Sequence, residues 1–268
     1  MTRIAELTDR TVLRLAGDDA RPFLQGMLTN DVDALAPDAP LWAGLLSPQG
    51  KYLFDMILFD AGPEGGDAIL VDVWAARAPE LLKRLAMYKL RKAVTVESTG
   101  LKVFAAWDGE SEAPYDPRLP GLGRRWVAAS AETSAGLDDY VAHRLSLGVP
   151  DSEDYPVDRL MWLESNAAEL NGVSFTKGCY VGQENTARMH HRDKLRKRLL
   201  PVLLGTDPGD DRSLRAGDRE AGELISAHGA RGIALMRLEF VERGEPLTIG
   251  GAAASVDWPS WLGPVPVA

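Results

Sequence analysis

The residues with the most evident chemical potential lie in one short segment, residues 177–184, which reads KGCYVGQE. It contains Cys179, the single cysteine of the chain, between Gly178 and Gly182. Glycine permits positive φ and close approach of other groups, so the two glycines predict a tight backbone around the thiol. The ammonium of Lys177 would favour the reactive thiolate. The alternative is a small apolar side chain filling a turn, because free cysteine is among the most buried residue types.

The same segment resembles the signature Lys-Gly-Cys-Tyr-x-Gly-Gln-Glu of the YgfZ/IBA57 family, and all seven fixed positions are present. Members of this family are folate-binding proteins that support iron–sulfur cluster assembly and repair, and they are related to the T-protein of the glycine cleavage system. The stretches at 170–176 and 23–31 are similar to the family as well. A match of this length that includes a rare cysteine is much more specific than a lone glycine motif.

The resemblance implies a function and a set of site residues. The function is that of a tetrahydrofolate-binding accessory protein for iron–sulfur cluster assembly or repair. Cys179 and Lys177 would be the catalytic pair, with Cys179 as nucleophile, contact of a transient cluster or persulfide, or redox partner. Tetrahydrofolate, or another reduced folate, would be the cofactor. The residues implied to bind it are Asp55, Tyr180, Gln183, Glu184, Glu164 and Asn166.

Asp55 also stands out from the residues alone. It is the one carboxylate inside the apolar stretch of residues 51–59, which reads as a strand buried on both faces. An unpaired buried carboxylate is costly, so Asp55 needs a partner or a ligand. One interpretation is a carboxylate satisfied by the backbone or by an arginine. The other is a folate contact, since the T-protein relatives carry an acidic residue at what looks like the same place.

Residues 144–148, RLSLG, depart from the related T-protein pattern Arg-Leu-Glu-Ala-Gly, whose glutamate holds the pterin. Ser146 stands at that position, and a hydroxyl does not offer the two charged oxygens of a carboxylate. We therefore expect no glycine-cleavage aminomethyl transfer, and a folate that relies on Asp55 or Glu164. A folate-dependent methyl or aminomethyl transferase is the alternative function. A binding module without chemistry is a third.

Residues 188–198 form a basic stretch in an acidic protein. It predicts a solvated face or an inter-domain strap, with an anion site for a folate glutamyl tail as the functional alternative. His190 and His191 would point apart on a strand, and no other ligand lies at a usual spacing, so no metal site is expected.

The remaining pattern indicates an α+β fold. Strands are expected at 11–17, 51–60 and 68–74, a helix from Pro79 with Leu90 on its apolar face, and a further helix over 159–169. From residue 199 on, short strand-like runs alternate with turns, as in a small β-barrel or sandwich. The resemblance implies a T-protein-like fold. Two intertwined lobes around a folate cavity, residues 1–192, would precede a small antiparallel β-barrel, residues 193–268.

Composition limits the partners. The 268 residues carry a formal net charge of −9, which disfavours nucleic-acid or anionic-membrane binding as the main role. One cysteine fits a reducing compartment, and the first nine residues lack the features of a signal or transit peptide. We therefore expect a cytoplasmic monomer. Its partners would be folate and iron–sulfur client or assembly proteins.

Overall fold

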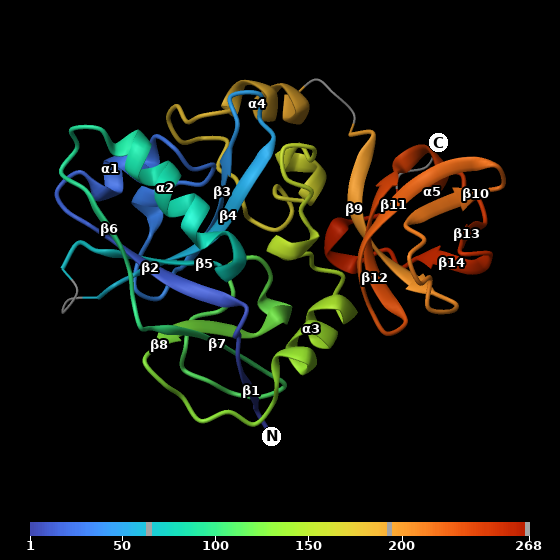
Figure 1. Ribbon diagram of the computed structural model, residues 1–268, viewed down its shortest axis with the longest axis horizontal. Helices are drawn as coiled ribbons and strands as arrows, with labels where there is room; N and C mark the ends of the chain where they lie inside the picture. Colours follow the sequence, from blue (N-terminus) through green and yellow to red (C-terminus); the bar gives the residue numbers. More distant parts are fainter. Residues whose placement is uncertain (63–65, 192–194, 266–268) are drawn as a thin grey trace.

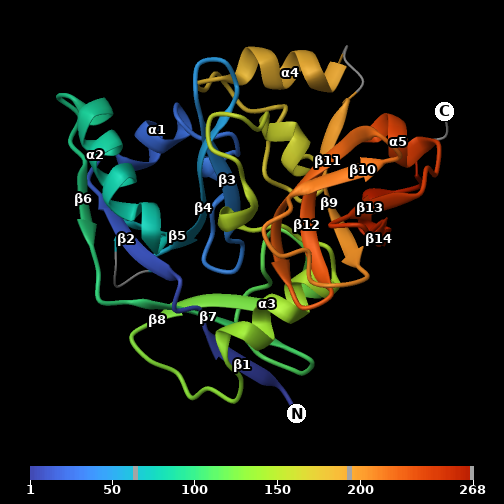
Figure 2. The same cartoon turned by 45° about the vertical axis from the view of Figure 1, so that its right-hand side comes forward.

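Two antiparallel sheets and a barrel make up the computed structural model, which describes residues 1–62, 66–191 and 195–265 (Figure 1). In two views related by 45°, the barrel lies on one side of the molecule and helix α2 (Ala78–Lys89) on the other (Figures 1 and 2). Among the described residues, no helix is both long enough and apolar enough to cross a membrane.

The larger sheet has five antiparallel strands. In spatial order they are β3 (Leu41–Leu46), β4 (Tyr52–Asp60), β5 (Ile69–Trp74), β2 (Arg10–Ala16) and β6 (Thr95–Ser98). β4 pairs with a neighbour on each side and its residues are buried on both faces except at the end. This confirms the expected interior strand, and it places Asp55 in the middle of the sheet.

The smaller sheet contains β1 (Arg3–Glu6), β7 (Lys102–Trp107) and β8 (Arg124–Ala128). Because β1 joins this sheet whereas the next strand, β2, joins the larger one, the two lobes are intertwined along the sequence. Helix α3 (Leu137–Ser146) packs beside β1.

Each face of the larger sheet has its own core. Helices α1 (Ala20–Gln25) and α2 lie over one face, where Leu24 and Leu81 pack with Met56 of β4. The opposite face carries an aromatic cluster that also includes side chains of the barrel. α2 begins where proline suits a first helical turn, as expected. Leu90 was expected on its apolar face and is instead exposed, because the helix ends at Lys89.

Short 3-10 helices connect these elements. They are η1 (Val32–Ala34), η3 (Ala75–Arg77), η4 (Pro120–Leu122), η5 (Ser152–Asp154), η6 (Trp162–Ser165) and η7 (Ser260–Leu262). The helix expected over residues 159–169 is wrong beyond the single turn of η6. Asn166 ends that turn with φ 67°, and its side chain is bonded to the barrel rather than to a helix.

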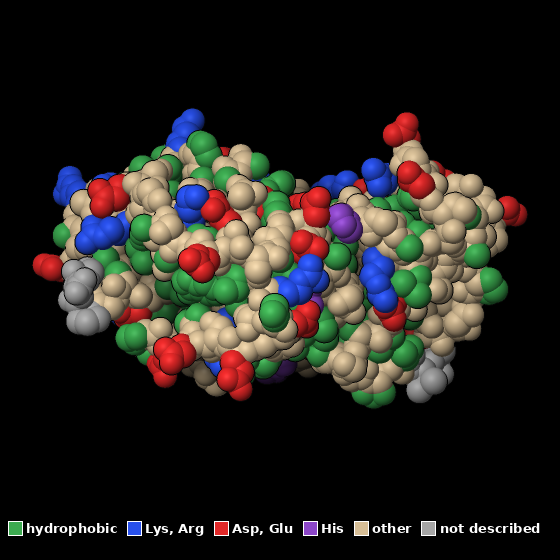
Figure 3. Space-filling view, turned by 90° about the horizontal axis from the view of Figure 1, so that it is seen from below, with side chains coloured by type: hydrophobic (Ala, Val, Ile, Leu, Met, Phe, Trp, Pro, Cys, Tyr) green, Lys and Arg blue, Asp and Glu red, His purple; other side chains and the backbone are tan. Residues whose placement is uncertain are grey.

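The C-terminal part is a closed six-stranded barrel preceded by helix α4 (Gln183–His191). Around the barrel the strands are β10 (Ser213–Ala216), β11 (Arg219–His228), β12 (Arg231–Arg237), β9 (Lys197–Leu204), β14 (Ala252–Val256) and β13 (Leu247–Ile249), with α5 (Leu238–Glu242) after β12. The predicted boundary between residues 192 and 193 lies outside the described residues. Seen from below, acidic and basic side chains are interspersed over both parts (Figure 3).

Candidate functional site

The signature segment is anchored to the turn between β3 and β4. Gly182 has φ +85°, and a Cβ atom there would lie 2.5 Å from the carbonyl oxygen of Ser47. Gly50, with φ +79°, faces it from the other side, and its added Cβ would meet the Gly182 oxygen at 3.1 Å. The Asn185 side chain donates a hydrogen bond of 2.7 Å to the Gln49 carbonyl. The expected tight backbone is therefore confirmed at Gly182.

Lys177 fixes the other end of the segment, and not in the way expected. Its ammonium donates hydrogen bonds to the carbonyl oxygens of Gln25, Leu28 and Asn30 at 2.8, 2.8 and 2.7 Å. Burial lowers the pKa of this ammonium to about 8. All three donors of the lysine are engaged by the chain after α1, so Lys177 holds the loop in place. Its predicted role as the activating cation of the thiol has no support in this geometry.

Tyr180, Gln183 and Glu184 form the transition from the loop to α4. The Gln183 side-chain oxygen accepts a hydrogen bond of 3.0 Å from the Tyr180 backbone N–H, which caps the start of the helix. The Tyr180 ring is half-buried against the aromatic cluster, and burial raises the pKa of its hydroxyl. Glu184 is exposed in the first turn of α4, where a carboxylate interacts favourably with the helix dipole. Tyr180 and Gln183 thus contact each other rather than a common cavity.

Cys179 is exposed. This excludes the alternative of a thiol that fills the core of a turn. A Cβ added to the preceding Gly178 would meet no atom within 4 Å, so the tight backbone expected at that glycine is wrong. The loop between the two anchors therefore holds the thiol in open surroundings.

Asp55 is buried and its carboxylate is engaged by the protein. One oxygen accepts hydrogen bonds from the Tyr52 hydroxyl at 3.0 Å and the Ser152 hydroxyl at 2.7 Å. The other accepts from the indole N–H of Trp42 at 3.0 Å. Ser152 in turn accepts from the guanidinium of Arg10 at 2.7 Å.

The surroundings of Asp55 do not fit a pterin. The cavity beside it measures about 10 Å³, which is room for about one water molecule. Trp42, Tyr52, Tyr155 and Trp162 fill the space around it, with ring centroids 4.9 to 6.3 Å apart. The partners are side chains that the sequence analysis did not consider, and their aromatic bulk occupies the place expected for the folate. In the structure Asp55 is an internal hydrogen-bonded carboxylate, and the folate contact at this residue stays a prediction.

Glu164 and Asn166 lie on the connection to the barrel. The Glu164 carboxylate accepts from the Met161 backbone N–H at 3.0 Å, and burial raises its pKa. Asn166 is fully buried. Its side-chain amide donates to the Leu199 carbonyl at 2.7 Å and accepts from Arg198 at 2.8 Å. Asn166 is thus a structural bond between the two parts of the chain and has no free polar group for a ligand.

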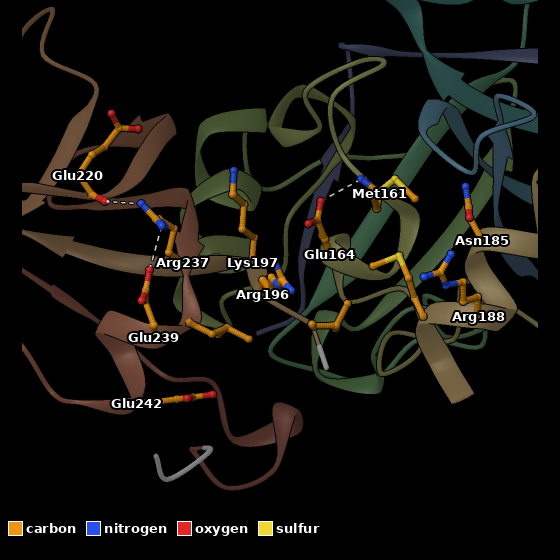
Figure 4. A pocket seen from close by; sticks show the side chains of 13 residues that line it. Met161, Glu164, Asn185, Arg188, Arg196, Lys197, Glu220, Arg237, Glu239 and Glu242 are labelled. Atoms are coloured by element: carbon orange, nitrogen blue, oxygen red, sulfur yellow. Dashed lines mark hydrogen bonds and ion pairs between the residues drawn. The ribbon is translucent and has the colours of Figure 1, made fainter. Parts of the chain in front are cut away.

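Glu164 instead faces a groove between α4 and the barrel (Figure 4). The groove has a volume of about 1190 Å³ and lies open to solvent between the end of α4 and the start of β9. Methionine and leucine side chains line it together with charges of both signs. The charged residues are Glu164, Arg188, Arg196, Lys197, Glu220, Arg237, Glu239 and Glu242. The basic stretch of residues 188–198 therefore contributes to a groove wall, and its first part is helical.

His190 and His191 lie at the end of α4 rather than on a strand. The ring of His190 stacks on Phe175 at 3.7 Å between centroids, and the two histidine rings are 4.8 Å apart. The expectation that they point apart on a strand is wrong because the helix of the signature extends to this point.

A buried network of charges joins the lobes, and the sequence analysis missed it. Asp72 accepts from Arg10 and Arg125, Asp116 and Asp151 pair with Arg118, and Arg144 pairs with Asp154. The neighbouring arginines hold the pKa of the Asp151 carboxyl well below its usual range. These residues are scattered from position 10 to position 154, so no local pattern in the sequence brings them together. The Arg125–Asp72 pair joins β8 of the smaller sheet to β5 of the larger one.

Comparison with known proteins identifies the family. Residues 196–264 match the family model described as CAF17, C-terminal beta-barrel domain. The chain is 34% identical to the mitochondrial iron–sulfur cluster assembly factor IBA57 of Mus musculus, over 88% of this chain and 78% of the relative. For the Homo sapiens protein of the same name the values are 34%, 94% and 84%. It is 37% identical to the IBA57 homolog of Mycosarcoma maydis, but spans 59% of that relative's length.

The solved structure of the glycine cleavage system aminomethyltransferase T from Bartonella henselae has the same fold. The TM-score is 0.64, over 95% of this chain and 84% of that one, at 13% sequence identity. This likeness concerns the fold alone, and it confirms the predicted T-protein-like α+β architecture.

The expected cytoplasmic localisation is contradicted, because the named relatives are mitochondrial proteins. A lone cysteine indicates a reducing compartment, and that class is wider than the cytoplasm. The composition of the first nine residues does not determine the compartment. The identities to the mouse and human proteins, over most of both chains, place this protein in the IBA57 family of iron–sulfur cluster assembly factors.

Proposed function

We propose that this protein supports the assembly or repair of iron–sulfur clusters in client proteins, and that Cys179 is the residue through which it acts. The observation that carries the proposal is the exposure of the only thiol of the chain on a loop that is anchored at both ends. The relatives' name, iron–sulfur cluster assembly factor, supplies the process.

The anchors suit the presentation of a thiol to a partner. On one side the Lys177 ammonium is bonded to three carbonyls, and on the other Gly182 packs against Ser47. A side chain on a fixed loop loses less conformational entropy when a partner binds than one on a mobile loop. The thiol can therefore meet a cluster or a cluster carrier without rearrangement of this chain.

For tetrahydrofolate, the support is the T-protein-like fold. We place the proposed folate contact at Glu164, because it is the predicted folate residue that lines an open groove, whereas Asp55 is enclosed. Calorimetric titration with tetrahydrofolate tests this assignment. Binding by the wild type that is weakened by Glu164→Gln supports it, and an absence of wild-type binding removes folate from the proposal.

Aminomethyl transfer is not part of the proposal. At the position of the T-protein glutamate, the Ser146 hydroxyl donates a hydrogen bond of 2.7 Å to the His143 carbonyl of its own helix. The groove at this helix end is lined by Trp258, Trp261 and Asp257, and the Asp257 carboxylate is paired with Arg231. Ammonia release from an aminomethylated lipoyl carrier protein at about 1 per second or faster would establish the transferase instead.

The central experiment compares Cys179→Ala with Thr176→Ala, an exposed neighbour in the same segment. In cells that lack the protein, we expect Thr176→Ala to restore the activity of an iron–sulfur client enzyme and Cys179→Ala to fail. Both variants should have wild-type melting temperatures, because neither side chain is buried. Full rescue by Cys179→Ala would show that the thiol has no part in the function.

A further inference from the structure

Helix α2 ends on the side of the molecule away from the barrel (Figures 1 and 2), and several apolar side chains are exposed at this end. Met87, Tyr88 and Leu90 are 60%, 46% and 84% exposed. Single exposed apolar residues need no explanation, but a group of them at one place marks an interaction surface more often than chance. The buried face of the same helix, with Leu81 and Leu85, is already used by the core.

The backbone at Leu90 adds a second anomaly. Leu90 has φ 47° and ψ −111°, a conformation that residues with a Cβ atom adopt at a cost. The turn that follows is held from two sides. The Lys89 ammonium donates to the Val94 carbonyl at 2.9 Å, and the Asp19 carboxylate accepts from the Ala93 N–H at 2.7 Å. The fold thus keeps Leu90 in a costly backbone conformation with its side chain in solvent.

The segment that contains this turn is basic in an acidic chain, although the Asp19 carboxylate of another segment contacts the turn at Ala93. Residues 81–96 contain no acidic residue, although the whole chain carries a net charge of −9. The basic residues in this stretch are Lys83, Arg84, Lys89, Arg91 and Lys92. Lys83, Arg91 and Lys92 are exposed. A positive surface on an acidic protein attracts acidic partners and accelerates their association.

We propose that the surface formed by Lys83, Met87, Tyr88, Leu90, Arg91 and Lys92, the α2-end surface, binds an acidic segment of another protein. Leu90 is the apolar anchor that enters the partner, and the surrounding cations pair with its carboxylates. The site goes beyond the thiol-based function, because it lies on α2 and not on the signature loop or α4, which occupy a different part of the molecule (Figures 1 and 2).

The shape of the surface favours a protein partner over a lipid bilayer. Helices that bind in the membrane interface present a whole apolar face. Here the apolar face of α2 is buried, and the exposed apolar side chains are confined to its end, where Leu90 is the most exposed. One projecting leucine with cations around it matches an apolar pocket with an acidic rim, which is the usual anatomy of a protein interface.

The test uses a synthetic amphipathic peptide with a leucine face and a glutamate face, titrated into the full chain by calorimetry. We expect binding that weakens as salt is added. Reversal of three charges, Lys83→Glu, Arg91→Glu and Lys92→Glu, should weaken it about tenfold or more. The matched control places the same three reversals on the barrel, at Arg212, Arg215 and Arg243, and should leave the peptide affinity unchanged.

Leu90→Gly distinguishes the effect of the leucine side chain on peptide affinity from its effect on the stability of the protein. Glycine accepts the observed φ without strain, so the melting temperature should stay the same or rise. The peptide affinity should nevertheless fall about tenfold, since an apolar anchor is lost. The control, Leu203→Thr on the barrel, should not change the peptide affinity.

Four results would overturn the proposal. One is the absence of peptide binding up to about 1 mM. Another is equal loss of affinity in the barrel control. The third is stronger retention of the protein by vesicles that contain an anionic phospholipid than by the peptide, which would assign the surface to a membrane. The fourth is self-association in sedimentation that Leu90→Gly abolishes, which would assign the surface to a second copy of the chain.

Discussion

Within the signature segment, the exposed thiol and its neighbours have different structural roles. Cys179 is exposed, whereas Lys177, Gly182 and Gln183 are used to hold the loop. The sequence suggested reactive chemistry for Lys177 and Cys179, because a lysine and a cysteine two positions apart resemble an activated nucleophile, whereas Gly182 was expected to shape the backbone. Several positions of the motif are therefore used in packing and hydrogen bonding, whereas Cys179 stays exposed.

The two glycines of the signature give a matched pair of substitutions. Gly182→Ala should lower the free energy of unfolding by about 2–4 kcal/mol, because its Cβ would lie 2.5 Å from the Ser47 oxygen and φ is +85°. Gly178→Ala should change it by less than about 0.5 kcal/mol, since its Cβ would meet no atom within 4 Å. Urea denaturation of both variants checks this. Equal losses would mean that Gly182 is not a close-contact position.

Lys177 gives a second prediction at this scale. Lys177→Met removes three hydrogen bonds to buried carbonyls and should cost about 1.5–3 kcal/mol of folding stability. Alkylation of Cys179 under native conditions should remain fast, because the ammonium is directed at the carbonyls. A variant of normal stability in which alkylation becomes much slower would restore the activating role to Lys177.

At the scale of the elements, β4 shows how a buried strand accommodates a single carboxylate. Its alternation sends Phe54 and Met56 to the helix-covered face and leaves Asp55 on the aromatic side. There Asp55 is satisfied by hydroxyl and indole donors. The strand thus bonds the sheet to η5 through Ser152, and the carboxylate has become part of the core.

Substitution of Asp55 should therefore act on stability. Asp55→Asn retains the shape but replaces charged acceptor capacity with one amide oxygen, and should cost about 2–3 kcal/mol. The melting temperature in the absence and presence of tetrahydrofolate measures both roles. We expect a lower melting temperature and the same folate-induced shift as in the wild type. Loss of that shift in a variant of wild-type stability would return Asp55 to a folate site.

The sequence predicted elements with a clear period better than it predicted the contacts between them. The strand at β4, the helix beginning near Pro79 and the C-terminal barrel follow from hydrophobic spacing and turn residues. The turn at η6 was misread as a long helix, because the left-handed conformation of Asn166 depends on its bond to Leu199 in the barrel. The bond between Asp55 and Ser152 could not be predicted either, because Ser152 is distant from Asp55 along the chain.

For the whole molecule, the dominant feature is the buried charge network between the lobes. Arg10, Arg118, Arg125 and Arg144 are all buried, and each is paired with a carboxylate. Removal of one partner from such a pair leaves an uncompensated charge and is strongly destabilising. The network makes the relative placement of the lobes specific.

Glu153 at the edge of this network gives a pH dependence. Burial and the nearby Asp154 raise the pKa of Glu153 to about 7, although Arg144 opposes the shift. Between the unfolded value of about 4.5 and about 7, the folded state holds a proton that the unfolded state has lost. This group therefore makes the protein less stable as pH rises through that interval.

Glu153→Gln should remove this contribution. Relative to the wild type, the variant should gain about 1 kcal/mol at pH 8, a value reduced for solvent screening of a half-exposed side chain, and about nothing at pH 4. Urea denaturation across this range measures the difference, with the exposed Glu132→Gln as control. A constant difference between variant and wild type at all pH values would contradict the assignment.

The contacts between the barrel and the larger sheet have a consequence for producing the barrel separately from the rest of the chain. Leu199, Ile233 and Leu235 of the barrel belong to the same core as Trp42 and Trp162. A buried hydrogen bond from the Asn166 side chain to the Leu199 carbonyl crosses the same junction. Residues 196–264 match a family model that describes the barrel alone. Detached from the first part, the barrel would expose these side chains to water, so we expect it to be less stable alone than within the full chain.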